Sequence, residues 1–296
     1  MSEIERAEQT WDEMDTTTVR SVAWLGVMAV TADIWGSFSA GRGPVAKVAE
    51  LLVERGKVDD LVGAALVCGD MQSERSHFEH APGVHFREVH GYDISQASLD
   101  RYTPDGIAWV PHKADCNRLD LPEEHFDLVV ASHGAHHVME LDRLFAEARR
   151  SLRPRGLLYM YEWVGPPYLR IPRRNRAIAA LLLLALFPRR RTRRTHMNRV
   201  KGLRWVLDGA DPAIDPSEAC NSLELYPAYR RHFEPVVEYF HGGLSYPMFE
   251  GIAQNFDQSR PGVRRRLAWA VRIERRLTAW GLVHPLFVVA VGERKA

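Results

Sequence analysis

Residues 63–75 read GAALVCGDMQSER, an apolar run that turns abruptly into polar sequence after Gly69. A short continuous apolar run between glycines is typical of a buried strand in a parallel sheet, because such strands are covered on both faces. A glycine directly after the strand lets the backbone turn sharply and lets a ligand approach it closely. We therefore expect a buried strand over residues 63–68 that ends in a ligand-binding turn.

Strand-like and helix-like segments alternate along the chain around this run. Apolar residues at helical spacing predict helices over 44–55 and 140–152. Short apolar segments predict further strands over 86–92, 107–110, 126–131, 156–161, 236–240 and 285–291. Strands that alternate with helices predict an α/β protein with a parallel sheet covered on both faces, which binds ligands at the carboxyl ends of its strands.

The charge of the chain is balanced in total but segregated along the sequence. Its 296 residues include 39 basic and 38 acidic side chains, a net charge of +1, so we expect no nucleic-acid partner. Residues 170–199 nevertheless contain ten arginines and no acid, which leaves −9 for the remainder. This stretch encloses the uncharged apolar run 177–187, which is shorter than the roughly 20 residues that a membrane span needs.

Three interpretations of the 170–199 segment stay open. It is a buried or capping helix with solvated arginine flanks, a site for an anion or acceptor, or an interfacial attachment to a membrane. The three cysteines, Cys68, Cys116 and Cys220, lie far apart without metal-binding spacing, which favours reduced cytosolic thiols. The acidic, polar N-terminus lacks the order of a secretory signal, so we expect a cytoplasmic protein.

Two acids follow the next predicted strands. Asp93 lies 24 residues beyond Gly69, at the end of the second strand, where an acid can accept hydrogen bonds from ribose hydroxyls. Its alternative role is to cap the following helix. Asp115 follows the third strand and could accept from an adenine amino group or form a turn. The sequence lacks the G-x-G-x-x-G pattern because Val67 and Met71 replace glycine, which disfavours a nicotinamide oxidoreductase.

In this order the motifs resemble the class I S-adenosylmethionine-dependent methyltransferases, of a bacterial small-molecule type, over about residues 60–165. The resemblance rests on the segments 91–95, 119–123, 126–132 and 152–158, and 162–166, 215–219 and 251–253 are similar to a bacterial subgroup. It implies a Rossmann-like seven-stranded mixed sheet whose last strand is antiparallel, and S-adenosyl-L-methionine as cofactor. The cofactor contacts that it implies are Cys68, Gly69, Asp70, Asp93, Ile94, Asp115, Cys116 and Asn117.

The same resemblance divides the chain into four segments. Residues 1–55 form an N-terminal helical cap and 56–165 the cofactor-binding core. Residues 166–235 form an arginine-rich insertion or acceptor cap, and 236–296 supply C-terminal strands and a helix that complete the core. Family members carry G-x-G-x-G after the first strand, and only Gly69 remains of the three. Because the side chain of Met71 could crowd the methionine portion of the cofactor, a degenerate, non-catalytic cofactor-binding domain stays an alternative.

The expected reaction is methyl transfer to a small-molecule acceptor. An in-line displacement from a sulfonium requires the protein to align acceptor and methyl group and to exclude water. A general base is needed only for an oxygen or nitrogen acceptor, and the candidates at the ends of the fourth and fifth strands are His137, His136 and Glu162, with His133 nearby. We expect only one of the adjacent histidines to point inward.

Two further expectations concern ligands. We expect no metal, because no acid stands at ligand spacing from the three histidines. Aromatic residues near the proposed mouth could wall an acceptor pocket: Tyr161, Trp163, Tyr168 and Trp205. The arginine-rich insertion keeps an anionic or membrane-associated acceptor open. The acceptor and the oligomeric state are not specified by the sequence.

Overall fold

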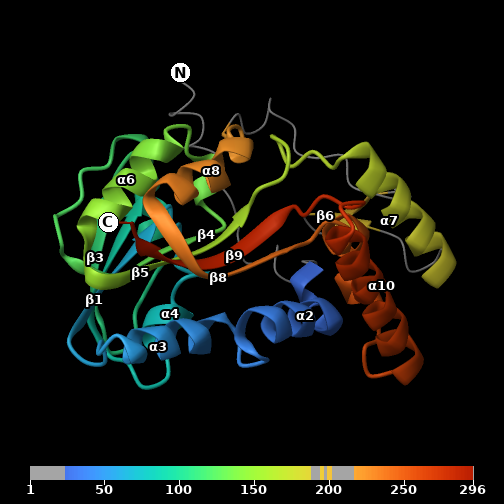
Figure 1. The fold of residues 1–296 in the computed structure, drawn as a ribbon, viewed down its shortest axis with the longest axis horizontal. Helices are drawn as coiled ribbons and strands as arrows, with labels where there is room; N and C mark the ends of the chain where they lie inside the picture. Colours follow the sequence, from blue (N-terminus) through green and yellow to red (C-terminus); the bar gives the residue numbers. More distant parts are fainter. Residues whose placement is uncertain (1–23, 188–193, 197–198, 202–216, 296) are drawn as a thin grey trace.

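The computed structural model describes residues 24–187, 194–196, 199–201 and 217–295. Figure 1 shows a twisted sheet with helices on both faces and two further helices at one end of the molecule. The sheet has seven strands, in the order β3 (Ala108–Lys113), β2 (Phe86–Asp93), β1 (Leu61–Leu66), β4 (Phe126–Ser132), β5 (Leu152–Trp163), β9 (Phe287–Arg294) and β8 (Phe233–His241). The expected α/β architecture with a seven-stranded sheet is confirmed.

Strand directions also follow the prediction. Each neighbouring pair from β3 to β5 is parallel, whereas β9 is antiparallel to both of its neighbours, β5 and β8. The last strand of the chain is thus a central strand of the sheet. This position agrees with its unbroken apolar sequence, because an exposed edge strand of that composition would invite pairing with other chains.

Two predicted boundaries need correction. Strand β1 ends at Leu66, so the turn that follows begins at Val67, two residues before Gly69. Strand β5 begins at Leu152, directly after helix α6 (Leu141–Ser151), although residues 153–155 had the sequence of a helix stop. Its pairing with β4 is irregular between Phe126 and Leu128, and Arg153 reaches the carboxylate of Asp127 at 2.7 Å. An ion pair and a bulge therefore let the strand start earlier than its turn-forming residues suggest.

The helices form one layer on each face. One face is covered by α2 (Met28–Ser39) and α3 (Pro44–Glu54), and the other by α6 and α8 (Ser222–His232). Helix α10 (Pro261–Ala279) packs on α2 at one end of the molecule. The remaining elements are η3 (Trp24–Gly26), α4 (Ser76–Glu79), α5 (Gln96–Leu99), η4 (Cys116–Arg118), η5 (Ala135–His137), α7 (Arg173–Leu186), β6 (Arg194–His196), β7 (Arg199–Lys201), α9 (Ser245–Phe249) and η7 (Ala253–Asn255).

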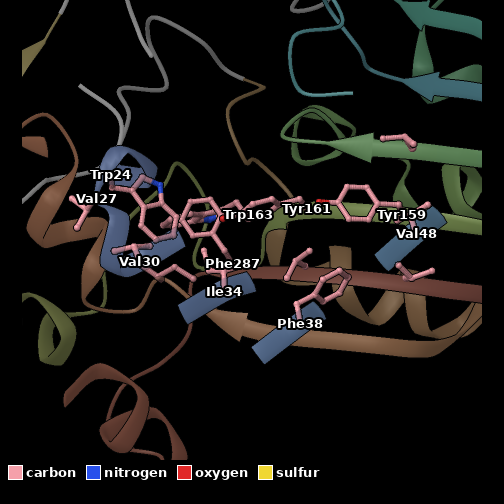
Figure 2. Packing of buried hydrophobic residues seen from close by; sticks show 14 of the residues in the cluster. Trp24, Val27, Val30, Ile34, Phe38, Val48, Tyr159, Tyr161, Trp163 and Phe287 are labelled. Atoms are coloured by element: carbon pink, nitrogen blue, oxygen red, sulfur yellow. The ribbon is translucent and has the colours of Figure 1, made fainter. Parts of the chain in front are cut away.

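Side chains of β5 alternate between the two hydrophobic cores, one on each face of the sheet. Tyr159, Tyr161 and Trp163 belong to the core under α2 and α3, whereas Met160 belongs to the core under α6 and α8. Figure 2 shows Tyr159, Tyr161 and Trp163 in this first core, together with Trp24, Ile34, Phe38 and Phe287. Because neighbouring side chains of a strand point to opposite faces, Glu162 emerges on the face of Met160.

The apolar run 177–187 forms most of helix α7, as the capping-helix interpretation requires, but the run is not fully buried. Ala179 and Leu183 are buried, whereas Leu181 and Leu184 are 66% and 48% exposed. Among the described residues, no helix is long and apolar enough to cross a membrane. The division of the chain into four segments stays a prediction.

Candidate active site

The turn after β1 has an unusual backbone. Val67, Gly69 and Met71 all have positive φ, at 53°, 49° and 61°. Glycine adopts this region without strain, whereas a β-branched residue such as Val67 does so only when its surroundings force it to. These are the three positions at which glycine was expected. The turn therefore keeps the path that three alternating glycines would allow, although two of them are replaced.

Neighbouring backbone holds the turn in this conformation. The Val67 amide donates to the Tyr92 carbonyl at 2.8 Å. On the other side the turn presses against Gly134, where an added Cβ would lie only 2.2 Å from the Val67 carbonyl oxygen. Since β1 and β4 are adjacent, the turn after one strand packs on the turn after the other. Contacts from both sides thus enforce the strained φ of Val67, as is common at functional sites.

Met71 differs from Val67 because its side chain is fully buried in the core under α2 and α3. We predict that Met71→Gly lowers the free energy of unfolding by about 1–3 kcal/mol. Removing the buried side chain costs several kcal/mol, and glycine at a positive φ recovers only part of that loss. Denaturant unfolding measures the change, with Val67→Gly as the control because Val67 is only half-buried. If Met71→Gly raised the free energy of unfolding, the prediction would be wrong, and the Met71 side chain would destabilise the turn.

Asp93 lies directly beside this turn. Its Oδ2 accepts from the Gly69 amide at 2.8 Å and its Oδ1 from the Ser95 amide at 2.9 Å, and the side chain is buried. The helix-cap alternative is wrong, because Ser95 caps α5 by accepting from the Ser98 amide. Two amides therefore fix the carboxylate at the ends of β1 and β2, where ribose hydroxyls are suitable donors.

Asp115 takes the turn-forming role. Its Oδ1 accepts from the Asn117 amide and from Asn117 Nδ2, both at 2.9 Å, which caps η4. Asn117 Oδ1 in turn accepts from the Met139 amide at 2.8 Å. The pair thereby joins the turn after β3 to the segment after β4. An adenine contact from Asp115 stays a prediction.

The other residues expected at the cofactor surround Asp93. Cys68 and Cys116 are buried, and burial, with a smaller contribution from Asp93, raises the pKa of the Cys116 thiol to about 12. Ile94 and Asp70 are half-buried, and Asp70 accepts from the Gln72 amide at 3.3 Å. These thiols stay protonated at neutral pH, so they offer no nucleophile.

A second cluster lies at the ends of β4 and β5, around the fully buried side chain of Glu162. Its Oε1 accepts from the amides of Gly134 and Ala135 at 2.9 and 2.8 Å, and its Oε2 lies 2.7 Å from His136 Nδ1. Gly134 also contacts Val67, so this cluster adjoins the turn after β1. Glu162 therefore holds the segment after β4, and a catalytic role for it stays a prediction.

Both adjacent histidines face the same acid, Glu218. His136 Nε2 lies 3.4 Å from Glu218 Oε1, and His137 lies with it in one compact group. His137 Nδ1 also lies 3.0 Å from Ser217 Oγ, and the two imidazole rings are 4.4 Å apart. Both rings thus lie on the side of Glu218, and which of them faces an acceptor stays a prediction. Residues of a tight turn with neighbouring rings can converge on one partner that a distant segment supplies.

His136 is an imidazolium between two carboxylates. Burial alone would lower its pKa, but the charges and hydrogen bonds of Glu162 and Glu218 raise the pKa to about 10. For Glu218, burial would raise the pKa, but His136 and His137 lower it to about 2. His136 is thus charged at neutral pH and cannot accept a proton there.

The triad of Glu162, His136 and Glu218 makes the free energy of unfolding depend on pH. The raised pKa of His136 adds stability that is fully present below pH 6.5 and is lost as the pH rises toward about 10. The lowered pKa of Glu218 adds stability that is present above pH 4.5 and is lost as the pH falls toward about 2. We predict that the contribution of the triad is largest between these limits. Denaturant unfolding of the wild type and of His136→Gln at several pH values tests this, and a parallel pH dependence of the two would contradict it.

The reason given for expecting no metal needs correction. His136, His137 and Glu218 place ligand atoms within 4.8 Å of one another, so an acid does stand near the histidines. The spacing of residues in the sequence could not reveal this acid, because Glu218 lies about 80 residues after the histidines. His136 pairs with Glu162 and with Glu218, and these ion pairs are enough to explain why the three side chains lie together. The prediction of no metal remains a prediction.

A third group lies on the opposite face of β5. Tyr161 and His241 are buried with ring centres 5.4 Å apart, and the His133 ring lies 4.4 Å from Tyr161. The Tyr161 hydroxyl, both ring nitrogens of His241 and Oε1 of Glu274 are buried without a hydrogen-bond partner among the described residues. Burial lowers the pKa of His133 to about 4 and that of His241 to about 3, so both are neutral at pH 7. Orphaned buried polar atoms are uncommon and often mark a place for a ligand or water.

The other expected wall residues are dispersed. Trp163 is buried and its Nε1 donates to the Pro166 carbonyl at 3.0 Å, whereas Tyr168 is half-buried. Trp205 lies outside the described residues. Sequence reasoning assigned no role to Glu218, His241 or Glu274. The segment 215–219 was a signal for the first, but nothing in the local sequence of the other two marked them.

Comparisons with known proteins agree with this geometry. Residues 65–160 match the model of a family described as methyltransferase domain. A sterol 24-C-methyltransferase of Yarrowia lipolytica is 32% identical over 82 residues, which cover 28% of this chain and 18% of that protein. A ubiquinone/menaquinone biosynthesis C-methyltransferase UbiE of Bordetella avium is 29% identical over 134 residues, 44% of this chain and 47% of that protein. The chain thus spans less than half the length of these curated relatives.

Solved structures share the fold over nearly the whole chain. Geranyl diphosphate C-methyltransferase from Streptomyces coelicolor has a TM-score of 0.51 at 12% identity and covers 100% of this chain and 99% of its own. The cyclopropane synthase MmaA2 from Mycobacterium tuberculosis has a TM-score of 0.51 at 13% identity and covers 98% of each chain. The matched domain over residues 65–160 and the shared strand order therefore make this chain similar to the class I S-adenosylmethionine-dependent methyltransferases.

Proposed function

We propose that this chain binds S-adenosylmethionine at the turn after β1 and transfers its methyl group to a small-molecule acceptor. The observation that carries the proposal is the turn itself, in which Val67, Gly69 and Met71 keep positive φ while the Gly69 amide is tied to Asp93. Strained backbone of this kind clusters at functional sites, which supports a ligand site at this turn.

The residues of the turn fit the cofactor. An added Cβ at Gly69 would meet nothing within 4 Å, so a ligand can approach this backbone closely. Asp93 would accept from the ribose hydroxyls, and Asp115 would lie toward the adenine. The cofactor supplies a methyl group on a sulfonium, which a nucleophile displaces in line. The buried surroundings of Cys68 and Met71 would help to exclude water from that step.

The acceptor would lie toward the ends of β4, β5 and β8. Relatives named for methylation of quinone precursors, sterols and geranyl diphosphate support a small molecule with a large apolar part. The orphaned polar atoms of Tyr161 and His241 lie among aromatic rings. An apolar molecule that carries a hydrogen-bonding group would suit both features.

His137 is the base that the geometry favours for an oxygen or nitrogen acceptor. It is half-buried, and Ser217 and Glu218 orient its ring. His136 is already protonated, and Glu162 is engaged by two amides and His136. The other catalytic candidates are therefore assigned to positioning: they hold the segment that carries His137.

Two measurements test the proposed function. Calorimetry with S-adenosylhomocysteine should show binding, whereas NAD should not bind. Incubation with methyl-labelled S-adenosylmethionine and the low-molecular-mass fraction of a cell extract should transfer label to a small molecule. Binding without transfer would favour the degenerate alternative. Absence of binding would remove the methyltransferase activity altogether.

We predict that His137→Gln lowers the rate of label transfer by about 10²–10⁴-fold without changing the affinity for S-adenosylhomocysteine. Loss of a positioned general base typically costs this factor, whereas the cofactor site lies on other residues. Rates over a range of pH provide the readout, since the rate of the wild type should fall at acidic pH, where a general base is protonated, whereas the rate of the variant should not show this fall. A rate of label transfer nearly equal to that of the wild type would contradict the assignment of His137.

A further inference from the structure

Helix α10 presents an unusual face to solvent. Tryptophan and arginine share one side of it at Arg265, Trp269, Arg272, Arg276 and the C-cap residue Trp280, at spacings of 4, 3, 4 and 4 residues. With 3.6 residues per turn, these five positions form one narrow stripe about 22 Å long. All five are exposed, and Trp269 and Trp280 reach 50% and 69% exposure. We call this set the α10 stripe.

The side of α10 opposite the stripe packs against the rest of the protein. Val263, Leu267, Ala270, Val271 and Glu274 are buried against the core. The stripe is therefore not needed to hold α10 in place. Exposing two tryptophans to water on one helical face is unfavourable, and exposed apolar patches usually mark an interaction site.

The charge around the stripe has one sign. Arg264, Arg266 and Arg275 flank it on either side and are exposed, whereas the single acid of the helix, Glu274, is buried. Arg275 approaches Asp33 at 3.9 Å, and no ion pair joins the other five arginines of the helix to a described carboxylate. The stripe would thus favour an anionic partner.

The neighbouring helix α7 extends this character. Figure 1 shows α7 and α10 at the same end of the molecule, beyond the ends of the strands. Leu181 and Leu184 of α7 are exposed, as is Leu282 just after α10. Exposed Arg173, Arg174 and Arg176 begin α7. This end of the molecule therefore combines exposed leucines and tryptophans with an excess of arginine.

We propose that the α10 stripe, together with the exposed leucines at the same end of the molecule, docks this protein on the surface of an anionic membrane. Tryptophan is the residue that most favours the interface between headgroups and acyl chains, and arginine can bury its stem while its charge meets lipid phosphate. The leucines distinguish this surface from a nucleic-acid site, which would use arginine and aromatic rings but would gain nothing from exposed leucine. Docking would bring the protein to acceptors that dissolve in the membrane, and it does not depend on the proposed function.

The experiment is flotation of the full chain with vesicles of phosphatidylcholine alone or with one third phosphatidylglycerol. The protein should float with the anionic vesicles and not with the neutral ones. Raising the salt from about 0.1 M to 1 M should reduce binding, because the screening length falls from about 10 Å to about 3 Å. Equal binding to both vesicles, or to neither, would overturn the proposal.

Two sets of variants locate the surface. Each basic residue near an anionic surface strengthens binding about fivefold, so replacing Arg265, Arg272 and Arg276 with glutamine should weaken it about 100-fold. The matched control removes the same charge at Arg42, Arg87 and Arg155, which are exposed elsewhere, and should leave binding within about threefold if the effect is local. An equal loss in both sets would reduce the proposal to a general charge effect and overturn it.

The second set tests insertion of the tryptophans. The double variant Trp269→Ala, Trp280→Ala should bind anionic vesicles at least tenfold more weakly, with Trp35→Ala, also exposed but on α2, as the control. Thermal unfolding should be unchanged, because both side chains lie outside the core. A single-stranded oligonucleotide serves as competitor: if it binds through the three arginines while vesicles do not bind, the partner is a nucleic acid and the membrane proposal fails.

Discussion

Replacing Asp93 with alanine is expected to weaken binding of S-adenosylhomocysteine by at least about 100-fold. Hydrogen bonds to a charged group contribute about 1.5–3 kcal/mol each, and the ribose offers two hydroxyl donors. The carboxylate also fixes the Gly69 and Ser95 amides, so its loss leaves the turn without its anchor. Calorimetry measures the affinity, and thermal unfolding reports how much of the loss comes from a disordered turn.

Two variants separate these contributions. Asp93→Asn retains a side-chain acceptor for one amide but loses the charge, so we expect an intermediate affinity. Asp100→Ala removes an acid from an exposed position at the end of α5 and should change nothing. An affinity of Asp93→Ala equal to that of the wild type would show that the cofactor does not meet this carboxylate.

Replacing Glu162 with glutamine is expected to lower the free energy of unfolding by about 3–5 kcal/mol. Removing one partner of a buried ion pair leaves the other charge without compensation. Here the imidazolium of His136 would retain only Glu218, whose side chain is 18% exposed and lies 3.4 Å away. Denaturant unfolding measures the loss. The matched variant Glu218→Gln should cost less, because water can replace part of its interaction.

A double-mutant cycle shows whether the loss is electrostatic. On the background of His136→Gln, the further change Glu162→Gln should cost much less, since no buried cation remains to be left alone. Additive effects would mean instead that Glu162 acts mainly through the Gly134 and Ala135 amides. Methyl transfer should fall with stability in either case, because Glu162 positions the segment that carries His137.

Much of the fold could be predicted from the sequence. The apolar strands at 63–68 and 285–291 were visible because buried central strands need unbroken apolar side chains. Boundaries were less accurate: residues 153–155 had the sequence of a helix stop, yet Asp127 and an irregular register place them in β5. Local sequence favours one backbone conformation, and an ion pair with a residue far away in the sequence can favour another.

The arrangement of residues around the candidate site was predicted in part. Gly69 and Asp93 follow successive parallel strands, so topology alone brings them to one edge of the sheet, and the 2.8 Å contact between them is what that topology predicts. The missing glycines suggested a damaged loop. The tertiary structure keeps the loop conformation because Tyr92 and Gly134 enforce it from both sides.

The sequence by itself determined the sheet, the edge at which Gly69 and Asp93 meet, and the distribution of charge along the chain. These depend on composition and short spacings, which the hydrophobic effect and strand geometry translate directly into structure. Only the tertiary structure decided that Glu218 joins His136 and His137, that Tyr161 and His241 keep orphaned polar atoms, and that arginine and tryptophan share one exposed face of α10. Each of these depends on which residues meet across the sheet or point away from the core, and that depends on the packing of segments far apart in the chain.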